Sequence, residues 1–342
     1  MLLIRICRPL TPMGLSNPPT APAMAGLGEL KPPGRPPARD MVWIPGGSLL
    51  MGSNNHYPEE APQHRVEVGG LWMDRAPITN AQFLKFIKAS GHRTLAERPA
   101  DPCQYPGAQP DLLAPASVVF AAPAASVDLG NYYNWWKYVA GADWRHPEGP
   151  GSSIKGREHH PVVHVAFEDA EAYAQWAGKR LPTEAEWEWA ARGGLEGKDY
   201  AWGDELHPGG SVLANTFQGD FPYTNSQRTG LVRTSPVGSY PANGYGLVDM
   251  IGNVWEWTQD WYLDHGARLD SSCCAASASA RERSIATDLG AIRIPRKVVK
   301  GGSFLCAPSY CRRYRPAARM AQGVDTSTCH MGFRCVISRP TP

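Results

Sequence analysis

Two cysteines near the C-terminal end of the chain, Cys306 and Cys311, have the residue type and spacing needed for redox or metal chemistry. They follow Gly301-Gly302-Ser303 and enclose Ala-Pro-Ser-Tyr, in which proline and serine favour a turn that would bring the two thiols together. Two soft thiolates without a nearby histidine suit linear Cu(I), whereas structural zinc would want four ligands. A loop disulfide and two unrelated buried thiols remain alternatives, because free cysteine often serves only as a small apolar side chain.

Positive charge follows the cysteine pair closely, and a cation near a thiol favours its thiolate form. The arginines concerned are Arg312, Arg313, Arg315 and Arg319. Eight cysteines are too few for a disulfide scaffold in a chain of this length, so we expect reduced thiols. No role is predicted for Cys7, Cys103, Cys273, Cys274 and Cys329.

Two acidic residues, Asp249 and Glu256, bracket a Gly-Asn turn in the segment DMIGNVWEW. Carboxylates combined with turn carbonyls supply the hard oxygen ligands that Ca2+ prefers. The segment therefore predicts a structural calcium site. A turn carrying two solvated acids is the alternative.

The composition is that of an ordinary globular protein with many turns. Of 342 residues, 42% are apolar and 19% are charged, and 35 Gly and 32 Pro accompany 12 Trp. We expect a single irregular, loop-rich α+β domain of low secondary-structure content, with a core held by tryptophans. The net charge of +2 is spread without a basic block, so neither a nucleic-acid nor a membrane-surface partner is expected.

The first 40 residues contain repeated Pro-Pro pairs and predict a disordered tail, with the folded domain at residues 41–338. No run reaches the roughly 18 apolar residues of a membrane span. Arg5, Arg8 and Pro9 interrupt the opening apolar segment before it reaches the length of a signal-peptide core. The expectation is a monomeric, cytoplasmic protein.

The elements that must position the cysteine pair are short. Strands are predicted over residues 41–47 and 48–51, joined as a hairpin, and over residues 65–74. Caps and apolar spacing predict helices from Thr79 or Asn80 to Gly91, over Glu168–Ala177, and from a Thr183/Glu186 capping box to Gly193. The irregular stretch 92–160 is rich in Pro, Trp and Tyr, and loops of that length usually have a function.

Taken together, several segments resemble the formylglycine-generating enzyme family, the sulfatase-modifying factors, over residues 41–337. The most specific are WAGKRLPTEAEWEWA and GNVWEWT, and the cysteine pair is typical of the catalytic branch. Further matching segments are MVWIPGGSLLMGS, EEAPQHRV, PITNAQF, WRHPEGPGSSI, YAWGD, KGGSFLC and GFRC. The resemblance implies the irregular fold of that family, which is related to C-type lectin domains.

The resemblance also implies an activity. Family enzymes oxidise a cysteine in a Cys-Xaa-Pro-Xaa-Arg segment of an unfolded or nascent sulfatase to Cα-formylglycine, using O2, copper and an external thiol reductant. By this comparison Cys306 and Cys311 hold the copper, and the substrate contributes the thiol that is oxidised. Copper is needed because ground-state O2 is a triplet that reacts slowly with closed-shell thiols.

Supporting residues follow from the same comparison. Ser303 and Trp255 would shape the pocket on the O2 side, while Tyr310, Arg319 and His330 would line the substrate groove. Each has a simpler alternative. Trp255 suits an apolar core, Ser303 suits the turn after Gly-Gly, and Arg319 suits a structural ion pair.

The family pattern places one calcium on Asp249, Glu256 and the carbonyls of Gly252 and Val254. A second calcium would use Asn215 and the carbonyls of Thr216 and Leu231, but Thr229 stands where the family has an aspartate. The loss of one formal charge weakens this second site.

Two other functions compete with the oxidase. One is a non-catalytic binding or scaffold module, because the same fold also serves as a display scaffold. The other is an iron-dependent sulfoxide synthase of the ergothioneine type, in which a helical bundle supplies a histidine triad. The 40 residues before the domain are too short for that bundle and contain no histidine.

Overall fold

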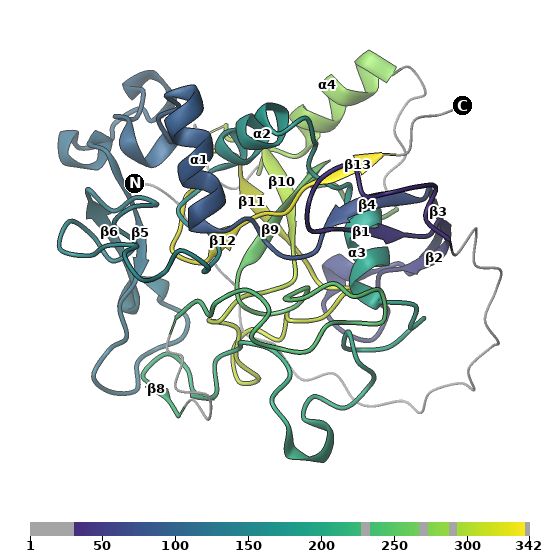
Figure 1. Cartoon of the computed structure of the whole chain (residues 1–342). Helices are drawn as coiled ribbons and strands as arrows, with labels where there is room; N and C mark the ends of the chain where they lie inside the picture. The colour runs from purple at the N-terminus through teal and green to yellow at the C-terminus, as the bar shows by residue number, and fades with distance from the viewer. Residues whose placement is uncertain (1–30, 227–232, 267–272, 287–292, 339–342) are drawn as a thin grey trace.

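The strands on either side of the cysteine loop form one four-stranded sheet of order β11-β10-β9-β12 (Figure 1). Within it β10 is antiparallel to β9 and β11, whereas the short β12 is parallel to β9. Their bounds are Trp255–Trp261 for β9, Arg296–Lys300 for β10, Arg319–Gly323 for β11 and Met331–Gly332 for β12. The computed structural model describes residues 31–226, 233–266, 273–286 and 293–338.

Residues 41–74 form a long antiparallel ribbon, and the predicted hairpin within residues 41–51 is wrong. β1 (Met41–Ile44) pairs with β4 (Leu71–Asp74), and β2 (Gly47–Met51) pairs with β3 (His64–Val68), in one continuous register. The Pro-Gly step thus interrupts a strand instead of reversing it. Gly46 permits this because a Cβ there would lie 2.8 Å from the backbone of the opposite strand. β13 (Val336–Ser338) extends the ribbon by pairing with β4.

The three predicted helices are confirmed, with their caps. α1 (Asn80–Ser90) and α3 (Glu184–Arg192) begin with the capping boxes of Thr79 and Thr183, and end at Gly91 and Gly193 in the left-handed conformation. α2 (Phe167–Trp176) begins and ends one residue before the predicted bounds. These boundaries could be predicted because each depends on residues three or four positions apart.

The rest of the described chain consists of short elements joined by loops, so the prediction of a loop-rich α+β domain is confirmed. The ribbons are β5 (Ala116–Phe120) with β6 (Trp136–Ala140), and β7 (Gly219–Asp220) with β8 (Thr224–Asn225). α4 spans Cys273–Arg283. Short 3-10 turns are η1 (Pro58–Glu60), η2 (Leu95–Glu97), η3 (Pro102–Gln104), η4 (Pro110–Leu113), η5 (Tyr132–Asn134) and η6 (Pro208–Gly210).

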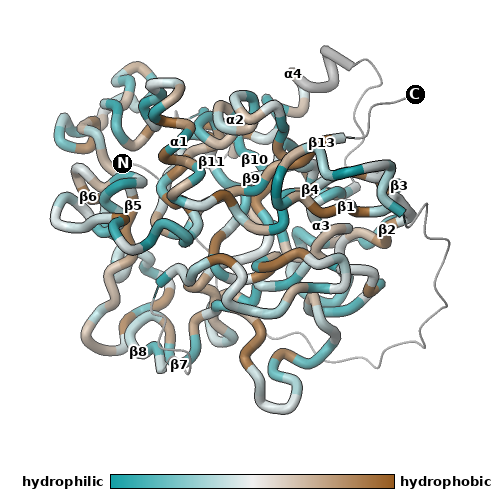
Figure 2. The backbone as a smooth tube through the Cα atoms, viewed as in Figure 1, coloured by the Kyte–Doolittle hydropathy of each residue, from teal (hydrophilic) through white to brown (hydrophobic). Residues whose placement is uncertain are grey.

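Tryptophan dominates the core, as the composition predicts. The largest fully buried side chains include Trp135, Trp144, Trp187, Trp255 and Trp257. Figure 2 shows apolar stretches running through the middle of the fold and polar stretches along many outer loops. None of the helices in the described ranges is long and apolar enough to cross a bilayer. Residues 31–40 carry neither helix nor strand, and the first 30 residues of the predicted tail lie outside the described part.

Candidate active site

The cysteine loop begins where β10 ends, and two glycines turn the chain there. Gly301 has a φ of 92° and Gly302 a φ of 69°, a conformation that side chains rarely adopt. A Cβ on Gly302 would also lie 2.8 Å from the backbone nitrogen of Tyr314. The Gly-Gly step therefore presses the start of the loop against its returning limb.

The loop then folds back through two backbone turns. Cys306 N donates to the Ser303 carbonyl at 2.9 Å, and Cys311 N donates to the Ala307 carbonyl at 2.9 Å. As a result the two Sγ atoms lie 3.4 Å apart, so the predicted meeting of the thiols is confirmed. This distance is far longer than the roughly 2.05 Å of a disulfide, so the two cysteines are not bonded to each other.

Both thiols are buried, with 2% of Cys306 and 1% of Cys311 exposed. Two soft sulfur donors fit a monovalent copper ion by donor chemistry. Among the described residues no cluster of three or more His, Cys, Asp or Glu side chains could hold a metal ion. The pair would therefore form a two-ligand site, open to a further ligand from a substrate.

Ser303 connects the cysteine pair to the neighbouring strands. Its backbone nitrogen donates to the Cys306 Sγ at 3.4 Å, and its Oγ lies 3.0 Å from His330 Nδ1. The Oγ also accepts from Leu305 N at 3.2 Å, so the turn-forming alternative describes part of its role. Trp255 N in turn donates to the His330 carbonyl at 2.9 Å. The structure thus brings Ser303, His330 and the first residue of β9 into one group beside Cys306.

His330 is buried and uncharged at neutral pH. Burial, with a smaller contribution from the charge of His164, lowers the pKa of His330 to about 3. A neutral imidazole can donate or accept the hydrogen bond with the Ser303 hydroxyl without adding charge to the site. Its ring also packs edge-on against Trp136, at 5.0 Å between centroids.

An aromatic wall encloses the other side of the loop. Tyr310 stacks on Phe221 with 4.5 Å between ring centroids, and Trp135 packs edge-on against Tyr310 at 5.5 Å. Sequence reasoning did not single out Trp135 or Phe221. For Trp135 a signal was available in the sequence, because it belongs to a Trp-Trp dipeptide in the long irregular stretch 92–160.

Beside the wall, the tip of the loop reaches the surface. Pro308 and Ser309 are exposed, whereas the thiols lie behind them. A cavity of about 250 Å³ borders this tip. Its other lining residues are Leu206, His207, Thr216, Phe217, Gln218, Gly219 and Ser226.

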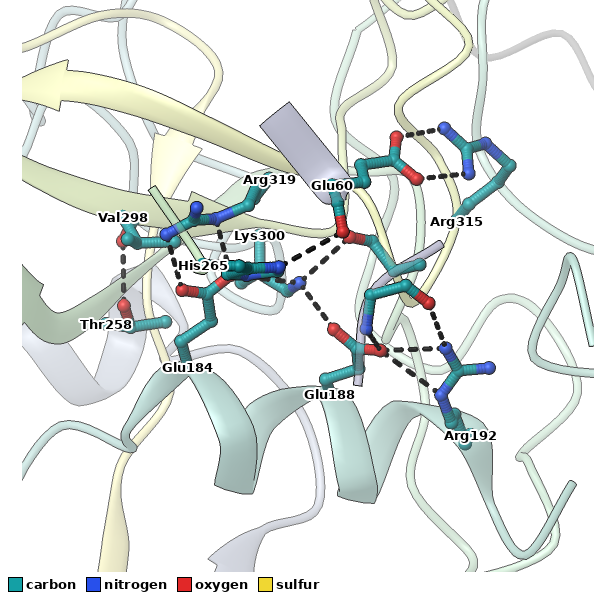
Figure 3. A network of polar contacts seen from close by, with 12 residues as sticks. Glu60, Glu184, Glu188, Arg192, Thr258, His265, Val298, Lys300, Arg315 and Arg319 are labelled. Atoms are coloured by element: carbon teal, nitrogen blue, oxygen red, sulfur yellow. Dashed lines mark hydrogen bonds and ion pairs between the residues drawn. The ribbon is translucent and has the colours of Figure 1, made fainter. Parts of the chain in front are cut away.

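Arg319 lies elsewhere, in the buried polar network of Figure 3. It is 2% exposed, its Nη2 donates to Glu184 at 2.9 Å, and its Nη1 donates to the Leu263 carbonyl at 2.8 Å. Its guanidinium also lies over the ring of Tyr262. These contacts correspond to the structural ion pair, not to a residue that lines a substrate groove.

The residues predicted to hold the first calcium lie close together, but the carboxylates of Asp249 and Glu256 have different hydrogen-bond partners. Glu256 accepts from Arg334 Nε and Nη2 at 2.7 Å each and from Trp187 Nε1 at 2.8 Å, so it already has a cationic partner. Asp249 accepts from Gly238 N at 2.7 Å, and burial raises the pKa of Asp249 to about 6. Arg334 thus engages the Glu256 carboxylate, and the first calcium site stays a prediction.

The second calcium site lies partly outside the described residues, because Leu231 and Thr229 fall in the range 227–232. Asn215 is buried, and its Nδ2 donates to the Arg233 carbonyl at 2.8 Å. Thr216 is also buried. This site therefore stays a prediction.

Comparison with known proteins gives a consistent result. Residues 27–339 match the family model described as "Sulfatase-modifying factor enzyme 1-like domain". The chain is 54% identical to a formylglycine-generating enzyme of Mycobacterium tuberculosis, over 87% of this chain and 97% of that protein. It is 46% identical to a formylglycine-generating enzyme of Streptomyces coelicolor, over 92% of this chain and 95% of that protein.

A solved structure of PvdO from Pseudomonas aeruginosa shares the fold, with a TM-score of 0.57 and 23% identity over 88% of this chain and 96% of that chain. The family match covers all of the described residues, and it includes the cysteine loop and the strands that position it. The chain belongs to the formylglycine-generating enzyme family, the sulfatase-modifying factors.

Proposed function

We propose that this protein oxidises a cysteine in the Cys-Xaa-Pro-Xaa-Arg segment of a sulfatase to Cα-formylglycine, with O2 and a thiol reductant. The observation that carries the proposal is the pair of buried thiols whose Sγ atoms lie 3.4 Å apart on the loop after β10. The relatives named formylglycine-generating enzyme support the same reaction class. A scaffold without catalysis would have no need for two buried thiols held this close together.

The residues of the chain have separate tasks in this proposal. Cys306 and Cys311 would hold copper, which when bound supplies the one-electron chemistry that triplet O2 requires. Ser303 fixes the Cys306 sulfur through its backbone N–H. Trp255 and Tyr310, both almost fully buried, keep water away from the thiols. The substrate segment would reach the pair from the exposed tip of the loop.

A turnover experiment tests the proposal. Purified protein loaded with Cu(I) is given reductant, O2 and a peptide containing Cys-Thr-Pro-Ser-Arg. We expect the peptide to lose mass and to gain an aldehyde that a hydrazide probe captures, with release of sulfide. Omission of copper after treatment with a Cu(I) chelator should stop the reaction. Protein that binds copper but leaves the peptide unchanged would instead fit a non-catalytic module.

We further propose that calcium stabilises the fold, with Asp249 as its main charged ligand. In this case calcium at about 100 times its dissociation constant should add roughly 2.7 kcal/mol to the free energy of unfolding. Asp249→Asn should lose this gain while folding without calcium. Thermal unfolding with calcium or with a chelator measures the difference. Elemental analysis after exhaustive dialysis that finds no calcium would count against the assignment.

A further inference from the structure

The positive charges around the cysteine loop are not equivalent, because most are matched by a buried carboxylate. Arg315 donates to Glu60 at 2.9 Å, and these two side chains are almost fully buried. Lys300, immediately before the loop, donates to Glu188 at 3.0 Å. Arg319 is paired with Glu184, as described above. These pairs leave little net charge that could act on the thiols.

Arg313 differs because it contacts a thiol directly. Its Nη1 lies 3.9 Å from the Cys311 Sγ. Its guanidinium carbon lies 3.8 Å from the centroid of the Tyr57 ring, and its Nε donates to Glu59 at 3.0 Å. The Arg313 side chain is 9% exposed and that of Glu59 is 21% exposed. The positive member of this ion pair therefore contacts the sulfur, and the negative member is the more exposed of the two.

The metal-loaded site needs such a charge. Two thiolates and one Cu(I) carry a net charge of −1, and a third thiolate from the substrate makes the charge −2. A net negative charge buried away from water is costly unless a cation compensates it. Solvent screens the more exposed Glu59 more strongly than it screens Arg313. The pair should therefore act on the sulfur mainly through its positive end.

We propose that Arg313 is a positioning residue that compensates the negative charge of the copper-loaded thiols, and that Glu59 and Tyr57 hold its guanidinium against Cys311. This inference rests on the copper site of the proposed function. The compensation matters more when the substrate thiolate is present, because the charge to be balanced doubles.

If Arg313 has a purely structural role, a different result is expected. Arg312 N donates to the Tyr57 hydroxyl at 3.0 Å, so the segment 57–60 also clamps the loop mechanically. If Arg313 acted only as a part of this clamp, removal of either partner of its ion pair would weaken copper binding. If Arg313 acts through charge, Glu59→Gln keeps an oxygen that accepts from the guanidinium and removes only the negative charge, so binding is not weakened.

The test measures Cu(I) affinity of the apo protein without O2, by competition with a chromophoric chelator at one pH. Arg313→Gln should weaken Cu(I) binding by roughly 10- to 100-fold. The loss should be larger with the Cys-Thr-Pro-Ser-Arg peptide present. Arg313→Lys should restore most of the affinity, and Glu59→Gln should bind Cu(I) at least as tightly as the wild type.

Three outcomes would refute either the charge role of Arg313 or the copper site itself. Wild-type affinity in Arg313→Gln, or equal weakening in Glu59→Gln and Arg313→Gln, would refute the charge role of Arg313. Absence of Cu(I) binding by the wild type would instead refute the copper site of the proposed function. Circular dichroism and thermal unfolding of each variant establish that it is folded. If Arg313→Gln does not fold, the Cu(I) affinities of Arg313→Lys and Glu59→Gln still decide whether Arg313 acts through its charge.

Discussion

Replacement of Cys311 by alanine is expected to abolish formylglycine formation while the protein stays folded. The Cys311 Sγ lies 3.4 Å from the Cys306 Sγ, and one thiol alone cannot form the two-sulfur site. Loss of a metal that activates the reaction removes several kcal/mol of transition-state stabilisation, so the rate should fall by roughly a thousandfold or more. Peptide turnover and Cu(I) content of the purified variant are the two measurements.

Cys335→Ala is the matched control for this experiment. Cys335 is also a free, fully buried thiol, but it directly precedes β13 and its backbone N–H donates to Asp74. The substitution removes the same atom from the core, so it controls for the cost of a small cavity. We expect it to keep copper and turnover. A Cys311→Ala variant that turns over as fast as Cys335→Ala would contradict the proposed mechanism.

Local signals in the sequence predicted the loop geometry well. Cys306 and Cys311 are separated by a Pro-Ser turn, and a turn acts over a few residues, so the meeting of the thiols could be foreseen. The helix cap at Thr79 and the capping box at Thr183 could be predicted for the same reason. In each case the residues that decide the conformation lie next to one another in the chain.

Contacts between distant segments were beyond this kind of reasoning. Phe221, Trp135 and Tyr310 meet only in three dimensions, and no spacing rule links them. The same holds for the contact of Glu59 with Arg313, which joins the turn η1 to the loop. The Pro-Gly step after β1 also looked like a hairpin, because the partner strand that continues past it lies twenty or more residues later.

Arg319 shows how family position and physical role can diverge. Its guanidinium is fully engaged by Glu184 and by backbone carbonyls within the network of Figure 3. Arg319 begins β11 opposite Lys300, at the base of the cysteine loop, and its side chain contacts Glu184 in the buried network. In this chain it pairs with the buried carboxylate of Glu184.

The same network gives the second prediction: Glu188→Gln should destabilise the fold by about 3–5 kcal/mol, because it removes the carboxylate that pairs with both Lys300 and Arg192 in the interior. Glu188 is fully buried and accepts from Lys300 Nζ at 3.0 Å, Arg192 Nη2 at 2.7 Å and Gly52 N at 2.9 Å. Glutamine has the same shape but no charge, so the loss reports the charge and not a cavity. Chemical unfolding at neutral pH measures it.

The exposed pair of Lys198 and Asp204 provides the control. Their side chains are 43% and 60% exposed, so Asp204→Asn should change the free energy of unfolding by less than about 1 kcal/mol. A loss of that small size in Glu188→Gln would show that the buried network does not stabilise the fold as proposed.

The pH dependence separates charge from packing. Burial alone would raise the pKa of Glu188, but the charges of Lys300 and Arg192 outweigh burial and hold the pKa below its ordinary value. A carboxylate of this kind stabilises the fold above the pKa it has in the unfolded chain, and the contribution fades as the pH falls. The difference between wild type and Glu188→Gln should therefore be largest at neutral pH and should shrink below about pH 4. A difference that stays constant down to acid pH would mean that glutamine disturbs the packing, because a lost charge cannot act once the wild-type carboxylate is protonated.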